Sequence, residues 1–440
     1  MEENRTRVEY LSSHQHNNTG RRPDDGGSPP KGRDIMKRSI TTITAGVCAL
    51  ALVAGACGSD DDAASDDTTV ETAAPDDAGG DEAATDNGAD AAAGDCETTD
   101  SVSLQLQWFT QAQFGGYYAA ADQGFYADQC LDVEIKEGAV EIVPQAELAS
   151  GNADFAIAWV PKALQTREAG ADIVNIAQVF ERSGTLQVSF ADNGIESPAD
   201  FEGKVIGNWG FGNEYEVFAA IGAAGLDPAT DVELVGQQFD MIALLEGEID
   251  AAEAMTYNEY AQVLEAVNPD TGELYQPEDF NVISYEEEGV GMLQDAIWAD
   301  AGRLADDTEY RDAAVRFVAA SLQGWAFCRD NVEQCATIVT EAGSTLGESH
   351  QQWMMNEVNK LIWPASGANI GLIDQAAWDQ TVEISENTPN LDGATVLTGD
   401  PGDGAFTNDI VTEAVALLDG VDLVGSGYSP TEITLNEGGN

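Results

Sequence analysis

From residue 101 onward, short apolar segments typical of strands alternate with longer segments whose apolar residues recur at helical spacing. Alternating or continuously apolar runs predict strands at residues 102–107, 131–136, 155–159 and 173–180. Helical periodicity predicts helices between these strands, at residues 115–123, 143–150 and 161–169. This order predicts a first sheet with helices packed on it.

A second set of strand and helix patterns begins near residue 200. Its strands are expected at residues 204–207, 232–235, 251–255 and 281–284, with a helix at residues 213–223. A strand at residues 294–299 precedes five expected helices, at residues 310–330, 332–342, 348–362, 374–386 and 408–418. Alternation of this kind predicts parallel sheets that are covered by helices on both faces.

The two sets together predict an α/β protein of two βα lobes that are joined by a hinge of two crossover strands. The first lobe is expected at residues 101–190 plus 286–425, the second at residues 191–285, and a C-terminal tail at residues 426–440. Folds of this kind bind ligands at the carboxyl ends of their strands. A ligand cleft is therefore expected between the lobes.

The N-terminal region has the layout of an export signal. Residues 36–56 contain a short basic stretch and then an apolar run without charge, which is too short for a stable membrane span. Small residues precede Cys57 and resemble a lipoprotein lipobox, although Ala54 stands where Leu is usual. The alternative is an ordinary signal peptide with an incidental cysteine. Residues 1–35 are interpreted as a mis-called upstream start, the alternative being a genuine cytoplasmic extension.

An acidic segment follows the signal, at residues 57–100. From Asp60 to Asp100 it holds fifteen acidic residues and no Lys, Arg or aromatic residue. Such a segment buries too little apolar surface to offset its ordering entropy, so it is expected to be a disordered linker. A lipidated Cys57 and this linker would tether a folded domain to the outer face of a membrane.

The charge and the cysteines narrow the classes of function. A net charge of −61 repels nucleic acid and anionic lipid headgroups. Two of the three histidines precede the export signal, so a histidine-based metal site or triad is not expected. Thiols outside the cell pair readily, and the favoured disulfides are Cys328–Cys335 and Cys96–Cys130, out of three pairings. Four free thiols are the alternative.

Aromatic, amide and acidic residues gather where the expected strands end. Aromatic runs are often core and single acids often lie on the surface, but Gln111, Gln113 and the glycines after them suit a ligand-binding loop. The candidate contacts are Trp108, Gln111, Gln113, Phe114, Tyr117, Trp159, Trp209, Phe211, Asn213, Glu214, Tyr257, Asn258, Glu259 and Asp295.

These loops contain no base, since Lys162, Arg182 and Lys204 lie outside them. Nitrate, sulfonate or phosphate would require Arg or Lys donors. A neutral or cationic heteroaromatic ring, stacked on Trp and Tyr and paired with a carboxylate, is expected instead. Glycines 210 and 212 could form an anion-binding nest, but the adjacent Glu214 argues against a phosphate there.

Three segments resemble the SsuA/THI5-like substrate-binding proteins of ABC importers. They are residues 104–135, which contain QAQFGGYY at residues 111–118, residues 148–156 (LASGNADFA) and residues 202–207 (EGKVIG). The resemblance spans roughly residues 101–420, with Cys130 in place of a family glycine. It implies a type II periplasmic-binding-protein fold that closes on a small molecule and delivers it to an ABC permease and its ATPase.

Members of this family take up thiamin pyrimidine precursors, riboflavin, alkanesulfonates, taurine or nitrate, and QAQFGGYY most resembles the pyrimidine-precursor branch. The resemblance implies a monomeric, extracytoplasmic, lipid-anchored receptor without cofactor or metal. Enzymes of this fold that synthesise pyrimidines use a histidine and iron with a cysteine-rich loop. Here Gln113 replaces that histidine and the loop has no Cys, so catalysis is not expected. A structural or adhesive lipoprotein is the remaining alternative.

Overall fold

The structure is a computed structural model that describes residues 96–440, within the compact unit Thr85–Asn440. The expected upstream extension, the export signal, Cys57 and the acidic linker up to residue 95 lie outside the described residues. The account below concerns residues 96–440 alone.

A first five-stranded sheet has the order β2-β1-β3-β10-β4. Strands β1 and β2 are parallel, as are β1 and β3, whereas β10 runs antiparallel to both β3 and β4. All five residues of β3 are buried, which explains its continuous apolar sequence. The strands are β1 Asp100–Gln105, β2 Leu131–Lys136, β3 Phe155–Trp159, β4 Ile173–Gln178 and β10 Asp295–Asp300.

A second five-stranded sheet has the order β7-β6-β8-β5-β9. Strand β6 is parallel to β7 and β8, and β5 is antiparallel to β8 and β9. Each sheet therefore contains one strand inserted against the direction of its parallel core. The strands are β5 Thr185–Phe190, β6 Val205–Asn208, β7 Glu233–Gly236, β8 Ala251–Met255 and β9 Phe280–Ser284.

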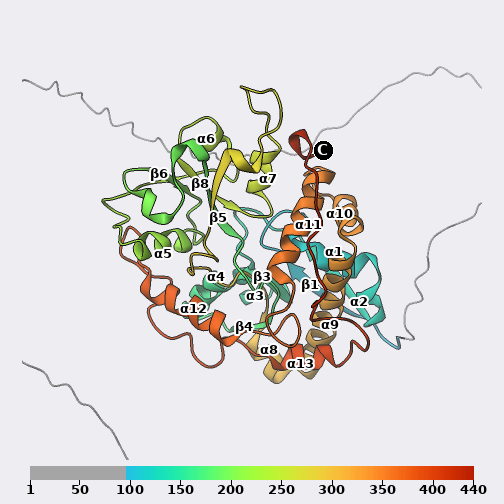
Figure 1. The fold of residues 1–440 in the computed structure, drawn as a ribbon. Coiled ribbons are helices and arrows are strands. Elements are labelled where there is room, and N and C mark those ends of the chain that lie inside the picture. Colours follow the sequence, from blue (N-terminus) through green and yellow to red (C-terminus); the bar gives the residue numbers. More distant parts are fainter. Residues whose placement is uncertain (1–95) are drawn as a thin grey trace, which may run out of the picture. The chain divides into compact units, whose positions relative to one another are not determined.

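Helices cover both sheets (Figure 1). Helix α9 packs on α1, α10 and α13, and α12 contacts both α4 and α5. Glycines 116 and 324 allow α1 and α9 to approach closely, because a Cβ at Gly324 would collide with the Gly116 carbonyl. The helices are α1 Gly115–Asp122, α2 Phe125–Asp128, α3 Pro144–Ala149, α4 Val160–Glu168, α5 Tyr215–Ala223, α6 Ile242–Leu245, α7 Glu259–Leu264, α8 Ala301–Asp306, α9 Thr308–Asp330, α10 Val332–Glu341, α11 Glu348–Ile362, α12 Gln375–Asn387 and α13 Asp409–Val415.

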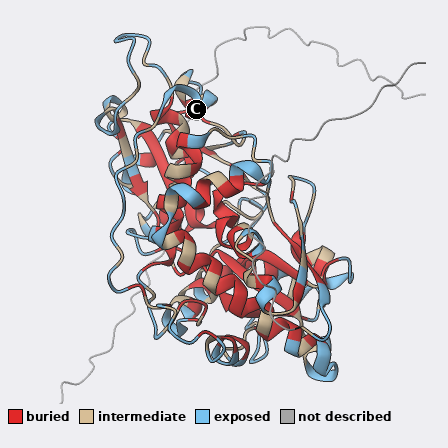
Figure 2. Ribbon diagram, turned by 90° about the vertical axis from the view of Figure 1, so that its right-hand side faces the viewer, coloured by how far each residue is buried: buried red, intermediate tan, exposed pale blue. Residues whose placement is uncertain are grey.

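The buried residues are concentrated in the strands and on the helix faces that cover them (Figure 2). Two chain segments connect the sheets, at residues 179–184 between β4 and β5 and at residues 285–294 between β9 and β10. They are joined by hydrogen bonds, because the Gln294 Nε2 donates to Thr185 Oγ1 at 2.7 Å and the Gly184 N–H donates to Gln294 Oε1 at 2.9 Å. Neither segment is a strand, so two irregular segments stand where a hinge of two crossover strands was expected.

Both sheets are mixed, so the expectation of parallel sheets is wrong for β5 and β10. The expected boundary of the first lobe at residue 190 is also wrong, because β5 at Thr185–Phe190 pairs within the second sheet. Hydrophobic pattern reports burial but carries no strand direction, which explains the first error. Strand β5 and the short helices α6, α7 and α8 were not predicted at all.

The favoured disulfides are confirmed: Cys96 is bonded to Cys130, and Cys328 to Cys335. The second disulfide is buried and joins the end of α9 to α10. It lies against the start of α1, where a Cβ at Gly115 would stand 3.0 Å from the Cys335 sulfur. The disulfide therefore supports the segment that carries Gln111 and Gln113.

The C-terminal residues 426–440 contain no long helix or strand but are packed against the rest of the unit. The Asn436 N–H donates to Ser349 Oγ on α11 at 3.2 Å, and the Gly438 N–H donates to the Glu265 carbonyl beyond α7 at 3.2 Å. In Figure 1 this dark red segment runs beside α11. The tail therefore links α11 to the region of α7.

Candidate functional site

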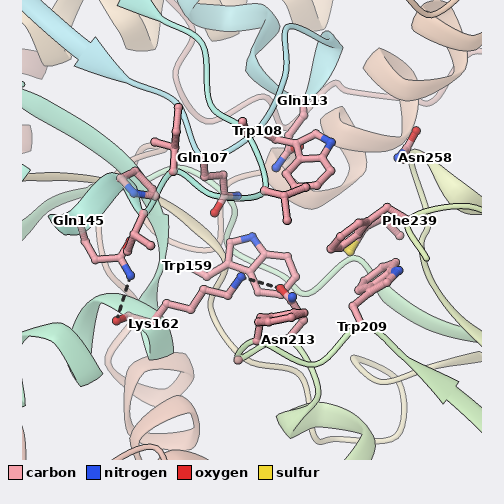
Figure 3. Close-up of a pocket in the computed structure, with 18 of the residues that line it drawn as sticks. Gln107, Trp108, Gln113, Gln145, Trp159, Lys162, Trp209, Asn213, Phe239 and Asn258 are labelled. Carbon is pink, nitrogen blue, oxygen red and sulfur yellow. Dashed lines mark hydrogen bonds between the residues drawn. The ribbon is translucent and has the colours of Figure 1, made fainter. Parts of the chain in front are cut away.

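A cavity of about 610 Å³ lies where strands of the two sheets end. Segments that follow the first sheet's strands form one side, called here the first-sheet wall: Gln107, Trp108, Gln111, Gln113, Gln145, Trp159 and Lys162. Segments that follow the second sheet's strands form the second-sheet wall: Trp209, Phe211, Gly212, Asn213, Tyr215, Phe239, Met255, Tyr257, Asn258 and Glu259. Figure 3 shows the labelled side chains of both walls around the cavity.

Three glutamines of the first-sheet wall are tied to one buried aspartate. Gln113 donates from Nε2 to Asp295 Oδ2 at 2.9 Å, and Gln107 donates from its Nε2 to Asp295 Oδ1. Gln111 donates in turn from Nε2 to Gln113 Oε1 at 2.7 Å. Asp295 begins β10, beside the end of β3, and is almost fully buried. Gln111, Gln113 and Asp295, three of the candidate residues named from the sequence, are thus linked by hydrogen bonds in the structure.

Burial raises the pKa of the Asp295 carboxyl to about 7. The hydrogen bonds from Gln113 and Gln107, and the nearby Lys162 ammonium, oppose this shift because they favour the charged form. Asp295 does not itself line the cavity. Its expected role as a direct ligand contact is therefore not supported by its position, which lies behind the glutamines.

Aromatic rings from both walls meet across the cavity. The Trp108 and Phe239 ring centroids are 4.8 Å apart, and the Trp209 and Phe239 rings are stacked with centroids 6.0 Å apart. Trp159 lies at the end of β3, on the first-sheet wall. Flat apolar rings of this kind suit a heteroaromatic ligand. Phe239 was missed in the sequence because it lies in an irregular stretch between β7 and α6.

The loop after β6 approaches the cavity in an unusual backbone conformation. Gly210, Phe211 and Gly212 have φ angles of 68°, 55° and 86°, in the left-handed region that only glycine adopts easily. Phe211 lines the cavity yet is 87% exposed. The Gly212 N–H donates to the Glu214 carboxylate at 2.8 Å. That bond occupies the N–H with a side-chain anion, so the glycines do not form the anion nest considered from the sequence.

A base does lie in the cavity, contrary to the expectation that the cleft loops contain none. Lys162, on α4, donates from Nζ to Asn213 Oδ1 at 2.6 Å and lies 4.8 Å from the centre of the Trp159 ring. Burial lowers the pKa of Lys162 to about 8, against the raising effects of Glu214, Glu253 and Asp295. Lys162 lies in the first turn of α4, outside the loops from which that expectation was drawn. It joins the two walls.

The segment after β8 supplies an acidic part of the second-sheet wall. Glu259 accepts hydrogen bonds from the Met255 N–H at 2.9 Å and from Asn258 Nδ2 at 2.8 Å. The other end of the Asn258 amide, Oδ1, is 2.9 Å from His350 Nε2, and His350 Nδ1 is 2.8 Å from Glu265 Oε1. Burial raises the pKa of Glu259. The carboxylate is thus held by the end of β8 and by Asn258, which in turn contacts His350 on α11.

The structure separates the remaining candidates. Phe114 and Tyr117 are fully buried among α1, α9 and the first sheet and do not line the cavity. Their ring faces pack in the core, so the expectation that they contact ligand is wrong for this structure. The Glu214 carboxylate accepts a hydrogen bond from the Gly212 N–H, and Glu214 does not line the cavity either. The lining residues that were not predicted include Gln107, Gln145, Lys162, Tyr215, Phe239 and Met255.

Residues 96–440 were also compared with what a metal site and a membrane-spanning helix require. No group of three or more His, Cys, Asp and Glu side chains in this part of the chain could hold a metal ion. None of the helices described is long and apolar enough to cross a membrane.

The fold is that of the periplasmic binding proteins called SsuA. The structure is similar to a putative periplasmic sulfonate-binding protein of an ABC transporter from Methylobacillus flagellatus, with a TM-score of 0.52, 16% identity, and coverage of 77% of this chain and 100% of that one. At this identity the likeness concerns the fold. It confirms the expected α/β class with two lobes.

Residues 111–334 match the family model described as NMT1/THI5 like, and the chain therefore belongs to the NMT1/THI5-like family. It is 27% identical over 250 residues to the formylaminopyrimidine-binding protein of Halalkalibacterium halodurans, covering 56% of this chain and 72% of that protein. It is also 24% identical over 326 residues to the riboflavin-binding protein RibY of Chloroflexus aurantiacus, covering 71% of this chain and 87% of that protein.

Proposed function

We propose that this protein is the extracytoplasmic substrate-binding component of an ABC importer and that it captures a formylaminopyrimidine or a related aminopyrimidine. The observation that carries the proposal is the combination of stacked aromatic rings with a wall of amides and a carboxylate. Trp108, Phe239 and Trp209 offer ring faces. The side-chain oxygens of Gln111, Gln107 and Glu259 offer acceptors. An aminopyrimidine presents a flat ring and N–H donors to match both features.

An anionic ligand fits this cavity less well. No arginine lines it, and Lys162 is engaged with Asn213 and lies near three carboxyl groups, those of Glu214, Glu253 and Asp295. Sulfonate or nitrate recognition would require cationic donors without such competing acids. The sulfonate, taurine and nitrate alternatives are therefore disfavoured within the same family.

Riboflavin is the second candidate ligand, and the volume of the cavity favours it. A cavity of about 610 Å³ exceeds what a single pyrimidine ring fills and lies in the range of sites for larger organic ligands. The similarity to a riboflavin-binding protein spans a larger share of this chain than the similarity to the formylaminopyrimidine-binding protein. The polar wall nevertheless suits a ligand whose donors point to one edge.

We infer binding rather than catalysis. The one histidine in the folded unit, His350, lies on α11 outside the cavity lining, and both its ring nitrogens are engaged by Glu265 and Asn258. A histidine and iron mechanism would need that side chain in the cavity. The relatives described above are named as binding proteins, which favours a receptor.

Delivery requires a permease and its ATPase as partners, and the proposal includes a monomer held to the outer face of the membrane by acylated Cys57. The lipobox-like segment before Cys57 and the acidic residues after it support this tether. Metabolic labelling with a fatty acid would incorporate label into the wild-type protein and none into Cys57→Ala.

Native mass spectrometry of the protein as purified, followed by thermal melts with candidate ligands, tests the function. A ligand that binds only the folded state raises the melting temperature. We expect a rise with a formylaminopyrimidine and none with an alkanesulfonate. A rise with riboflavin alone would transfer the assignment to the flavin branch, and yellow colour or flavin fluorescence of the purified protein would identify it directly.

A further inference from the structure

Asp295 controls the cavity from behind its surface. It accepts hydrogen bonds from the Nε2 atoms of both Gln113 and Gln107, one on each carboxylate oxygen. Above its pKa of about 7 Asp295 is ionised and has acceptors only, so both amides then turn their nitrogens toward it. The orientation of each amide is therefore set by the charge of Asp295 and by no other group that the structure places against those nitrogens.

The orientation of the Gln113 amide also fixes that of the Gln111 amide. With its nitrogen committed to Asp295, Gln113 offers only its oxygen to Gln111, and Gln111 donates to it from Nε2. The side-chain Oε1 atoms of Gln111 and Gln107 then accept no hydrogen bond from any residue between 96 and 440, and both side chains line the cavity. The first-sheet wall thus presents acceptors to whatever binds.

We propose that Asp295 is a positioning residue that fixes these amides so that the cavity selects ligands by their hydrogen-bond donors. The inference deepens the proposed function and rests on it, because it assumes that a pyrimidine occupies this cavity. A 4-aminopyrimidine places an N–H₂ donor against a glutamine oxygen. A 4-oxo pyrimidine places an oxygen there, so two acceptors face each other and one loses its partner on leaving water.

The cost of a buried polar group without a partner sets the size of the effect. Such a mismatch weakens binding by about 10–100-fold. Three titratable groups face Asp295. The ammonium of Lys162 on α4 opposes the rise in the pKa of Asp295. The Asp295 charge raises the pKa values of Tyr117 on α1 and Tyr257 after β8. Of these, only Lys162 carries a charge that favours the ionised carboxylate.

Asp295→Asn removes the cause while keeping the shape of the side chain. An asparagine has one acceptor and one donor end, so it can hold only one of the two glutamine nitrogens, and the other amide becomes free to rotate. A rotated glutamine offers a donor to the cavity and accepts the 4-oxo ligand. The discrimination between the two ligands should therefore shrink in the variant.

The test is isothermal titration calorimetry above about pH 8, where Asp295 is ionised, with 4-amino-2-methylpyrimidine and 2-methylpyrimidin-4-one. The two probes have different substituents at C4, and the oxo probe also carries a proton on a ring nitrogen. We expect the wild-type protein to prefer the amino probe by about 10–100-fold, and Asp295→Asn to lose most of that preference. Glu181→Gln is the matched control, since Glu181 is a buried acid that accepts from the Ser366 N–H away from the cavity lining. It should leave the preference unchanged.

Equal binding of the two probes by the wild-type protein, or an undiminished preference in Asp295→Asn, overturns the inference and leaves the proposed function intact. Binding of neither probe by the wild-type protein overturns both. If Asp295→Asn does not fold, as judged by its melting curve, Gln107→Met replaces it. That variant removes one acceptor, so affinity for the amino probe should fall more than affinity for the oxo probe; an unchanged ratio overturns the inference.

Discussion

The two walls of the cavity are built in different ways. On the first-sheet wall, Gln113 is buried and donates a hydrogen bond to Asp295, and the buried Trp159 at the end of β3 is the ladder partner of Asp295 in the sheet. On the second-sheet wall, Phe211 stands in a left-handed loop and is 87% exposed. Buried hydrogen bonds thus fix the first-sheet wall, whereas the loop after β6 on the second-sheet wall is exposed and less constrained.

The difference has a physical reason. Buried hydrogen bonds fix the direction of a donor or acceptor, because a group left without a partner is costly. Ring stacking depends mainly on area and tolerates a shift of the ring. We therefore expect the first-sheet wall, anchored by strands β1, β3 and β10, to select the ligand by its hydrogen bonds. The loops that follow β6 and β7 are expected to contribute ring stacking. The predictions below test this division.

The largest effect is expected where the rigid wall is supported from beneath. Replacing both Cys328 and Cys335 by Ala should lower the free energy of unfolding by about 2–4 kcal/mol. It should also weaken ligand binding, because this disulfide packs against Gly115 at the start of α1. Chemical denaturation and calorimetry measure the two effects.

Replacing Cys96 and Cys130 by Ala is the matched control. That disulfide fastens the start of the described chain to the segment before β2, away from the cavity lining. Stability should fall in the control as well, but ligand affinity should not. Equal losses of affinity in both double variants would contradict a special link between the Cys328–Cys335 disulfide and the first-sheet wall.

Next in size is the loss of a stacking ring. Trp108→Ala should weaken binding of a heteroaromatic ligand by about 1–3 kcal/mol, the usual range for one stacked base. Trp108→Phe keeps a ring against Phe239 and should lose less. Calorimetric titration of the two variants measures this series. If Trp108→Ala bound as tightly as the wild type, stacking across the cavity would have no part in binding.

The pH dependence of stability isolates Asp295 from the rest of the acidic chain. Burial raises its folded-state pKa to about 7, above the unfolded value of about 3.9. A carboxyl with a raised pKa stabilises the fold when protonated, and this contribution is lost as pH rises through about 7. Without ligand, the wild-type melting temperature should therefore fall more than that of Asp295→Asn between about pH 5 and pH 8.

Glu216, whose pKa burial also raises to about 7, is present in both proteins and cancels in this difference. Parallel melting curves for the wild type and Asp295→Asn across the pH range would mean that Asp295 titrates near its ordinary value. Asp295 would then be ionised throughout this pH range, and burial would not hold its pKa near 7.

The smallest effect is expected at Phe211. Because its side chain is 87% exposed, Phe211→Ala should change ligand affinity by no more than about 0.5 kcal/mol. Phe211→Gly should be more stable than Phe211→Ala by about 1 kcal/mol, since glycine adopts the φ of 55° without the Cβ penalty. A large loss of affinity in either variant would show that this ring closes over the ligand.

Parts of both walls could be predicted from the sequence, because the apolar pattern shows where several strands end. Strands β2, β3 and β8 lie where the apolar pattern placed them, so the residues that follow them, such as Trp159 and Tyr257, reach the cavity as expected. The cysteine spacing also led to the right disulfides. Local pattern is sufficient where a side chain's position follows from the end of a strand.

Other parts depend on contacts that a sequence does not display. Phe114 and Tyr117 belong to the same aromatic run as Trp108, and only the packing of α1 on α9 turns them into the core. Lys162 reaches the cavity from the first turns of α4, and Phe239 from an irregular segment. The antiparallel directions of β5 and β10 leave no trace in hydrophobic periodicity.

The measurement that tests the account most directly is calorimetric titration of the purified protein with a formylaminopyrimidine, riboflavin, an alkanesulfonate and nitrate in parallel. The account predicts micromolar or tighter binding of the aminopyrimidine and no heat of binding with sulfonate or nitrate. Binding of sulfonate or nitrate, with none of the pyrimidine or the flavin, would contradict it.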